Sequence, residues 1–296
     1  MIFVTGGSGF IGSYVIQRLG ENSDVIAVEN KTTIKGNVRK LKANLLDLNS
    51  CPNQEITTVI HLAAQIKEDN YFESFETMEK VNIYGLYELL KYSKRNRVKR
   101  FIHLSSMMVY KTPENGEFIT EDTPLIPSTF YGITKLTAEL LVRKYCLENN
   151  IEYIILRPSH VYGFGQNENY LIEKWVRNTI SKGTIEVINE GTSVMNTIYI
   201  KDLVSVIYHC LYSSEYNFVT NVVSRSNVKY IDLAYTISDI FGNNDVEIIH
   251  TTNENFKSKT YIYKYPKLLE DWNIDISNIE EGLIQYKSDL INMGVI

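Results

Sequence analysis

The segment FYGITK, residues 130–135, places a phenol and an ammonium four residues apart, at Tyr131 and Lys135. Residues i and i+4 of a helix lie on one face with Cβ atoms about 5–6 Å apart, so the two side chains can reach a common point. A free tyrosine has a pKa of about 10, and a nearby ammonium lowers it by stabilising the phenolate. The pair could therefore transfer a proton. Taken alone, it is more often a packing tyrosine beside a solvated lysine.

A glycine-rich loop stands at the start of the chain, in IFVTGGSGFIGSYVIQRL. Gly6, Gly9 and Gly12 follow a strand-like run and precede a helical pattern, and Gly7 completes a G-x-G-x-x-G spacing with the last two. Such glycines allow a tight turn and close approach of the backbone to a pyrophosphate, which the helix N-terminus attracts. The context of strand, loop and helix makes this motif a prediction of dinucleotide binding.

An acidic residue after the second strand is the next requirement, roughly 20 residues beyond the loop. The stretch VIAVEN supplies Glu29. A carboxylate there binds the ribose hydroxyls of NAD and repels the 2′-phosphate of NADP, although the lysines that follow, such as Lys35, soften that preference. We therefore expect NAD as the cofactor, with NADP as the alternative.

Short apolar runs alternate with longer amphipathic runs over the first half of the chain, which indicates βαβ units. Two of the runs, TVIHLA and YIILRP, are almost continuously apolar, as strands covered on both faces are. His61 and His103 lie in such runs and are interpreted as hydrogen-bonded core histidines rather than ligands. The sequence predicts an α/β fold with a doubly wound parallel sheet and a smaller C-terminal substrate-binding domain.

The composition restricts the class of protein. With 296 residues, 44% hydrophobic and 22% charged, the chain resembles an ordinary soluble globular protein, and its net charge of -5 gives no reason to expect nucleic acid or an acidic membrane as partner. Cys51, Cys146 and Cys210 form no metal-ligand grouping, so we expect no metal site and no disulfide framework. No apolar run is as long as a membrane span. A cytoplasmic protein is expected.

Several motifs in a fixed order resemble the extended short-chain dehydrogenase/reductase family, which holds nucleotide-sugar epimerases, dehydratases and 4-ketoreductases. They are TGGSGFIG, VEN, HLAAQ, VNIYGLYELL, LSSMMVYK, YGITK and LRPSHVYGFGQ. The resemblance implies that Tyr131 is the catalytic acid/base, that Lys135 is its partner and a ligand of the nicotinamide ribose, and that Ser106 holds the substrate oxygen. It also implies a Rossmann-type domain, residues 1–165 and 197–225.

The resemblance implies the remaining parts as well. A substrate-binding cap would comprise residues 166–196 and 226–296, and a homodimer would form through the helices beginning near Glu79 and Tyr131. The expected NAD-binding residues are Gly6, Gly9, Phe10, Ile11, Gly12, Glu29, Asn30, Asn44, Leu45, Leu62, Ala63, Ala64, Tyr131, Lys135 and Pro158. The expected substrate-binding residues are Gln65, Ser106, Met107, His160 and Met195.

The chain departs from the family pattern at several positions. The 4,6-dehydratases carry an Asp-Glu pair after the catalytic hydroxyl, whereas this chain has Met107 and Met108, whose thioethers cannot do that acid/base work. Met195 stands where an arginine usually clamps the substrate pyrophosphate, and His160 stands where many members have an asparagine. The sequence therefore argues against a dehydratase and leaves the nucleotide and the sugar open.

Three functions are consistent with these residues. The first is a C4 epimerase of a nucleotide-activated sugar, favoured by Glu29 followed by Asn30 and placed in polysaccharide biosynthesis. The second is a reductase of a nucleotide-linked 4-keto-6-deoxysugar, which needs the same Ser-Tyr-Lys set and an exchanging cofactor. The third is a non-catalytic dinucleotide-binding protein, because a fold alone does not fix a function.

Overall fold

The structure is a computed structural model that describes residues 1–20, 23–30, 32–36, 38–66, 72–114, 116–242, 246–253 and 259–296. Within these residues the chain forms two compact units, each described below by itself. Unit 1 consists of Met1–Lys111, Thr123–Pro158 and Val204–Asn221. Unit 2 consists of Thr112–Asp122, Ser159–Leu203 and Val222–Ile296.

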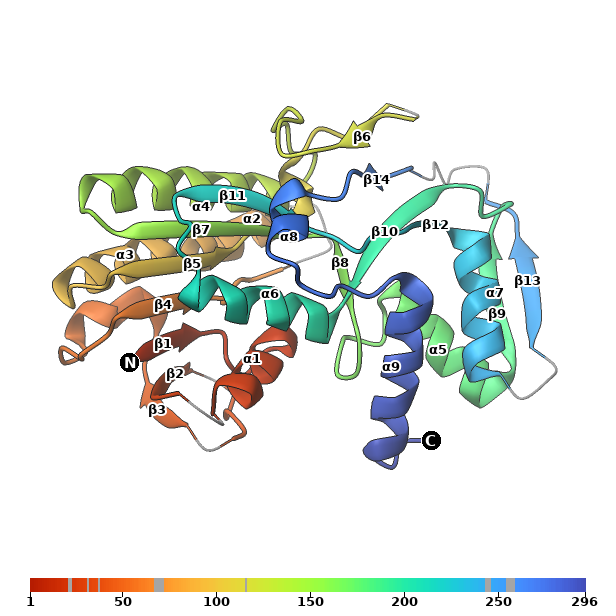
Figure 1. Ribbon diagram of the computed structural model, residues 1–296, viewed down its shortest axis with the longest axis horizontal. Helices are drawn as coiled ribbons and strands as arrows, with labels where there is room; N and C mark the ends of the chain where they lie inside the picture. The colour runs from red at the N-terminus through yellow and green to blue at the C-terminus, as the bar shows by residue number, and fades with distance from the viewer. Residues whose placement is uncertain are drawn as a thin grey trace. The chain divides into compact units, whose positions relative to one another are not determined.

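Unit 1 is built on a sheet whose described strands, seven in all, follow the order β11-β7-β5-β4-β1-β2-β3 (Figure 1). The pairs from β7 through β5, β4, β1 and β2 to β3 are all parallel. The strands are β1 (Ile2–Thr5), β2 (Val25–Glu29), β3 (Arg39–Lys42), β4 (Thr58–His61), β5 (Arg100–Leu104), β7 (Glu152–Pro158) and β11 (Phe218–Val222). All five residues of β5 are buried, as expected for a strand covered on both faces.

Helices connect these strands. They are α1 (Phe10–Gly20), α2 (Phe72–Met78), the π-helix η2 (Glu79–Gly85), α3 (Leu86–Arg95), α4 (Phe130–Glu148) and α6 (Ile200–Tyr212), with the short 3-10 turns η1 (Leu45–Ser50) and η3 (Met107–Val109). Helix α1 packs on β1 and β2, and α4 packs on β5 and β7. Parallel strands joined by such helices confirm the predicted Rossmann-type α/β fold.

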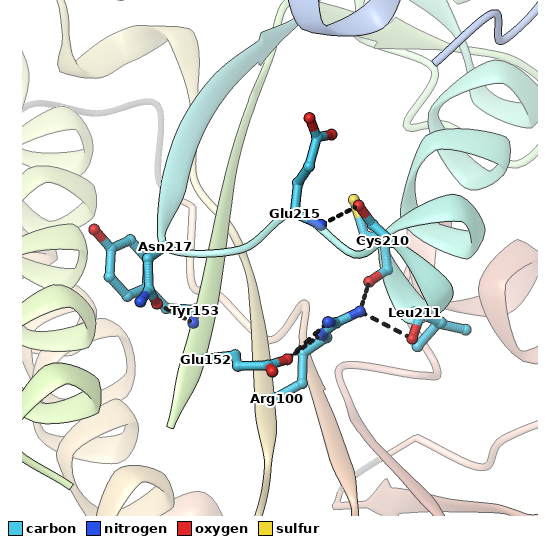
Figure 2. Close-up of polar contacts among 8 residues, drawn as sticks. Arg100, Glu152, Tyr153, Cys210, Leu211, Glu215 and Asn217 are labelled. Carbon is cyan, nitrogen blue, oxygen red and sulfur yellow. Dashed lines mark hydrogen bonds and ion pairs between the residues drawn. The ribbon is translucent and has the colours of Figure 1, made fainter. Parts of the chain in front are cut away.

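The last segment of unit 1 is fastened to the sheet at the amino end of β5 (Figure 2). Arg100 pairs with Glu152, its register partner on β7, through Nε at 2.8 Å and Nη2 at 2.7 Å from Oε2. Its Nη1 also donates to the carbonyl oxygens of Cys210 and Leu211, at 2.8 and 3.1 Å. These carbonyls end α6, where a cation offsets the negative end of the helix dipole.

The described residues of unit 2 contain the smaller sheets and four helices that lie wholly in this unit. Its described strands form the sheets β12-β10-β8, β13-β9 and β14-β6. They are β6 (Phe118–Ile119), β8 (His160–Tyr162), β9 (Thr184–Ile188), β10 (Val194–Tyr199), β12 (Asn227–Lys229), β13 (Glu247–Thr251) and β14 (Ile262–Tyr263). The helices are α5 (Leu171–Lys182), α7 (Tyr230–Phe241), α8 (Lys267–Asp271) and α9 (Ile279–Asn292).

The bounds of the two units differ from the predicted division at four places. Residues 112–122 and 159–165 lie in unit 2, the return to unit 1 begins at Val204 rather than at residue 197, and the returning segment ends at Asn221 rather than at residue 225. The first difference arises because β6 pairs with β14 near the end of the chain, a contact between distant segments. Among the described residues, no helix is long and apolar enough to cross a membrane.

Candidate active site

The glycine loop between β1 and α1 is closed by its own backbone. Gly6 has a φ of +75°, a left-handed conformation that glycine adopts without strain, and its carbonyl accepts the Gly9 N–H at 3.0 Å. A Cβ on Gly12 would lie 2.0 Å from the Gly6 carbonyl oxygen, and a Cβ on Gly6 would lie 2.6 Å from the Ala63 backbone nitrogen. The loop therefore requires glycine at both positions.

This loop leads directly into the N-terminus of α1. Phe10 and Ile11, the first two helical residues, are both half-buried, and Phe10 packs edge-to-face against Tyr14. The free N–H groups of a first helical turn, next to a glycine turn without side chains, form a cradle that suits a pyrophosphate. The loop residues thus fit the phosphate portion of a dinucleotide.

The acidic residue predicted to select the ribose is at the carboxyl end of β2, next to β1. Glu29 Oε1 accepts the Ile34 N–H at 2.9 Å, which engages one of its two carboxylate oxygens. A carboxylate has acceptor capacity beyond one bond, so it can also receive a ribose hydroxyl. Asn30, the next residue, is exposed.

The predicted adenine-side residues have different surroundings. Asn44 is exposed and caps η1, with its Oδ1 accepting the Leu46 N–H at 3.1 Å. The Leu45 side chain lies in the hydrophobic core of unit 1. Contact of Leu45 with a ligand would therefore come from its backbone.

Tyr131 and Lys135 lie in the first two turns of α4, as the sequence predicted for a helix start. Thr129 caps this helix, its Oγ1 accepting the Gly132 N–H at 3.1 Å. A Cβ on Gly132 would lie 2.2 Å from the Met108 carbonyl oxygen. Because Gly132 has no side chain, the start of α4 can close against the turn that follows β5.

Lys135 is only 3% exposed, so it is not the solvated lysine that the spacing alone suggests. Its Nζ donates to the Leu104 carbonyl oxygen at 2.5 Å. Burial lowers the Lys135 pKa to about 8, against the opposing effect of the Glu139 carboxylate, which raises it. A half-buried phenol, that of Tyr131, lies one helical turn away on the same face.

Ser106 begins the turn η3 and is 9% exposed. Its Oγ accepts the Met108 N–H at 3.2 Å, which leaves the hydroxyl proton free to be donated elsewhere. Leu104, two residues earlier, is the acceptor for Lys135, so Ser106 belongs to a segment that is held directly by α4. The structure brings Ser106, Tyr131 and Lys135 to one corner of unit 1.

A buried ion pair behind this corner was not identified from the sequence. Glu139 accepts Arg157 Nε at 2.9 Å and Nη2 at 2.6 Å, and also the Ser105 hydroxyl. Arg157 Nη1 donates to the Tyr110 hydroxyl at 2.9 Å, and that hydroxyl is 2.6 Å from Asn221 Oδ1. The available signal was the spacing of four residues from Lys135 to Glu139, which puts both on one helix face.

The two strand histidines lie next to each other, with ring centroids 5.3 Å apart, and burial lowers the pKa of each. His61 Nδ1 is 2.7 Å from the Thr5 hydroxyl, in agreement with a hydrogen-bonded core histidine. The expectation was wrong for His103, because neither of its ring nitrogens has a hydrogen-bond partner among the described residues. Its ring stacks on that of His61, whose Nδ1 is already bonded to the Thr5 hydroxyl.

The segment after β4 carries the predicted residues Leu62, Ala63, Ala64 and Gln65, all half-buried. Asn82 of the π-helix holds it in place. This amide accepts the Gln65 N–H at 2.7 Å and donates to the Gln65 carbonyl and to the Thr134 hydroxyl, both at 3.0 Å. Asn82 thus connects this segment to α4.

Pro158 is the buried last residue of β7 in unit 1, whereas His160 and Met195 belong to unit 2. His160 is exposed on β8. Met195 on β10 is only 3% exposed, so its thioether is part of the packing of unit 2. Among the described residues, no group of three or more His, Cys, Asp or Glu could hold a metal ion.

Residues 2–222 match the model of the NAD dependent epimerase/dehydratase family. The chain belongs to this family. The predicted resemblance to extended short-chain dehydrogenase/reductases is confirmed, and so is the predicted cofactor class, because the family is NAD-dependent.

Relatives within the family carry several activities. A trifunctional UDP-glucose 4,6-dehydratase/UDP-4-keto-6-deoxy-D-glucose 3,5-epimerase/UDP-4-keto-L-rhamnose-reductase of Arabidopsis thaliana is 30% identical over 95% of this chain and 46% of its own length. This chain thus spans about half the length of the first relatives that it matches. A Methanocaldococcus jannaschii protein provisionally named a UDP-glucose 4-epimerase is 32% identical over 69% of this chain and 70% of its own.

Solved structures with the same fold include the UDP-glucose 4-epimerase of Thermotoga maritima with UDP-glucose, with a TM-score of 0.86 and 24% identity over 100% of this chain and 99% of that one. The UDP-glucuronic acid 4-epimerase of Bacillus cereus with UDP-glucuronic acid and NAD has a TM-score of 0.83 and 21% identity over 99% of both chains. At this identity the likeness establishes the fold.

Proposed function

We propose that this chain is a NAD-dependent 4-epimerase of a nucleotide-activated sugar. The observation that carries the proposal is the corner of unit 1 where Ser106, the Tyr131 phenol and the buried Lys135 ammonium are held by one helix start and one strand end. Two names support the choice of reaction. One sequence relative is named a UDP-glucose 4-epimerase, and one solved structure with the same fold is that of a UDP-glucuronic acid 4-epimerase.

In this proposal the residues of the glycine loop and of the Tyr131 corner would hold NAD, which would supply the hydride acceptor and donor for C4 of the sugar. Tyr131 removes the proton from the C4 hydroxyl and later gives it back, since the neighbouring ammonium stabilises its phenolate. Ser106 donates its free hydroxyl proton to the same sugar oxygen. Lys135, held on the Leu104 carbonyl, also binds the nicotinamide ribose. Gly6, Gly12 and the other predicted cofactor residues bind the rest of the dinucleotide.

The turn after Ser106 supports an epimerase rather than a dehydratase. Met107 is 5% exposed and Met108 is half-buried, so thioethers occupy the positions where acid/base residues would be needed to remove a proton and eliminate water. Relatives named 4,6-dehydratase exist in the family, so this exclusion is part of the proposal.

A second candidate is a reductase of a nucleotide-linked 4-keto-6-deoxysugar. The name of the Arabidopsis thaliana relative includes a UDP-4-keto-L-rhamnose-reductase activity, and the same Ser106, Tyr131 and Lys135 would serve it. The two reactions differ in the fate of the hydride. An epimerase returns it to the same sugar, whereas a reductase consumes one reduced cofactor in each turnover.

The deciding experiment begins with the purified chain, which is denatured so that any released dinucleotide can be identified by mass spectrometry. UDP-glucose, UDP-glucuronic acid and UDP-N-acetylglucosamine are then each incubated with the chain without added cofactor, and inversion at C4 is followed by NMR. Retained NAD together with inversion supports the epimerase. Steady NADH or NADPH consumption with a 4-keto sugar, and no inversion, supports the reductase.

The matched control is Tyr131→Phe, which removes one hydroxyl and keeps the ring. We expect kcat to fall by about 10²- to 10⁴-fold, the usual contribution of a general acid/base group. Replacement of Tyr235, a 54% exposed tyrosine on α7, by Phe should leave kcat unchanged. If the wild type gave neither inversion nor cofactor consumption, and Tyr131→Phe left the biological activity unchanged, a dinucleotide-binding protein without this chemistry would be supported instead.

We also propose that the chain forms a homodimer through η2, α3 and α4. Ile83, Tyr84, Tyr87 and Leu141 line a shallow groove on these helices, and the Tyr84 side chain is 53% exposed. Leu140, next to the groove on α4, is 56% exposed. A dimer would remove these apolar side chains from water. Leu140→Glu should convert the dimer to a monomer in analytical ultracentrifugation, and a wild-type monomer would contradict the proposal.

A further inference from the structure

We propose that Glu139 is a positioning residue for the reaction of Tyr131 and Lys135, which anchors the end of β5 and sets the electrostatic surroundings of the lysine. The proposal rests on the proposed function only for the roles of these two residues. Its test uses NAD binding, so that it does not depend on the identity of the sugar.

The first argument is the stripe of residues along α4. Tyr131, Lys135 and Glu139 are successive i, i+4 positions and so lie on one face of the helix. Lys135 is 3% exposed and Glu139 is 1% exposed. A carboxylate and an ammonium one turn apart in a dry environment interact far more strongly than the same pair in water.

The second argument is how this stripe holds the strand end. Lys135 Nζ bonds the Leu104 carbonyl, and the Glu139 carboxylate accepts the hydroxyl of Ser105, the next residue. Two adjacent residues of the chain are thus fixed by two adjacent turns of α4. Ser106 follows at once, so its place relative to the Tyr131 phenol depends on both bonds.

The third argument is the partner of the Glu139 carboxylate. Arg157 meets it with two N–H groups, at 2.9 and 2.6 Å, in the planar geometry that matches a carboxylate. Both partners of the pair are almost fully buried, with side-chain exposures of 3% and 2%. The guanidinium therefore holds a negative charge one turn below Lys135.

The other ionisable groups that face Lys135 do not replace Glu139. His61 from β4 and His103 from β5 lie near enough to interact with the ammonium, but burial lowers the pKa of both, so that they are neutral at pH 7. Arg157 from β7 is a cation and already belongs to Glu139. Among the described residues, Glu139 is the carboxylate that raises the Lys135 pKa.

The experiment measures the NAD dissociation constant by titration calorimetry from pH 6 to pH 10. The wild-type affinity should weaken as Lys135 loses its proton at alkaline pH, and Lys135→Met should show weaker binding without this pH dependence. In Glu139→Gln the alkaline midpoint should move down by about one unit or more, because an opposite charge close by has been removed. Glu139→Asp, which keeps the negative charge, should have a midpoint close to that of the wild type.

Two further variants keep the test decisive. Glu139→Gln leaves Arg157 without its partner and can fail to fold, so Glu139→Gln/Arg157→Gln removes both charges, and its midpoint should still lie below that of the wild type. Glu152→Gln, at the other Arg–Glu pair of the sheet, should not move the midpoint. The proposal is overturned if the midpoint of Glu139→Gln and that of Glu139→Gln/Arg157→Gln both equal the wild-type midpoint. It is also overturned if Glu152→Gln moves the midpoint as far as Glu139→Gln does.

The result is separable from the proposed function. If Tyr131→Phe turned over normally while Glu139→Gln still shifted the pH dependence of NAD binding, the epimerase mechanism would fail and the positioning role of Glu139 toward Lys135 would stand. If the opposite pair of results were obtained, the mechanism would stand and Glu139 would be a purely structural residue.

Discussion

Two arginine–glutamate pairs of unit 1 lie at opposite ends of strand β7. Arg100 and Glu152 begin β5 and β7 and are 11% and 35% exposed, whereas Arg157 near the end of β7 and Glu139 on α4 are 3% and 2% exposed. The first pair shares its guanidinium with the carbonyls that end α6. The second shares its carboxylate with Ser105, beside the proposed catalytic serine.

The difference shows how burial changes the role of one chemical pair. A charge that keeps some contact with water loses little when its partner is removed, because solvent replaces the partner. A buried charge whose partner is removed has neither solvent nor a counter-ion, so the loss of either Glu139 or Arg157 alone should strongly destabilise unit 1. The same chemistry thus fastens α6 at one end of the sheet and holds the segment that contains Ser105 at the other.

The largest expected effect is the loss of Glu139. Replacement of Glu139 by Ala should lower the free energy of unfolding by about 3–5 kcal/mol, since it leaves the Arg157 guanidinium buried and unpaired. Glu152→Ala should cost about 1 kcal/mol or less, because Arg100 keeps its bonds to two carbonyls. Urea unfolding of the two variants measures both values. Equal losses would remove the distinction between the two ends.

The second expected effect is a loss of stability in acid that arises from His61, the last residue of β4. Burial lowers the His61 pKa from 6.5 to about 3, so below pH 6.5 the unfolded chain takes up a proton that the folded chain refuses. Stability from this group is complete above pH 6.5 and declines as the pH falls, by about 2 kcal/mol between pH 6.5 and pH 5.

Urea unfolding of the wild type and of His61→Asn at several pH values tests this expectation. The difference between the two curves should slope only below about pH 6.5, the ordinary pKa of a histidine. His250→Asn, at an exposed histidine of unit 2, is the control and should reproduce the wild-type slope. A constant difference between the wild type and His61→Asn would contradict the expectation.

The smallest of the three effects concerns the outer pair itself. Arg100→Gln should lower the free energy of unfolding by about 1–2 kcal/mol, because two carbonyls at the end of α6 lose a charged donor. The NAD dissociation constant should not change, since this pair lies at the amino end of β5. A weaker NAD affinity in the folded variant would show that the two ends are coupled.

The parts of the candidate site that could be predicted from the sequence are those formed by residues close together in the chain. The glycine loop needs neighbours within a few residues, and Tyr131 and Lys135 need only one helical turn, so their relation could be inferred without a structure. The alternation of apolar runs likewise sufficed for the α/β fold. In each case the deciding interaction lies within one element or its direct successor.

The parts that were missed depend on contacts between distant segments. Arg157 meets Glu139 only because α4 packs on β7, and no spacing in the sequence reports that contact. The same holds for β6, which pairs with β14, and for the burial of Met195. The absence of a hydrogen-bond partner for His103 among the described residues could not be inferred either, because an apolar run carries no information on nearby polar groups.

The division of the chain into two units has a consequence for the nascent chain during its synthesis. Unit 1 needs Val204–Asn221, which follows the whole of Ser159–Leu203, a part of unit 2. Until β11 has emerged from the ribosome, the apolar strand β7 is the outer strand of the sheet, with an unpaired backbone edge. Open edges of this kind attract other strands, so the nascent chain is exposed to aggregation at this edge until Val222, the last residue of β11, has emerged.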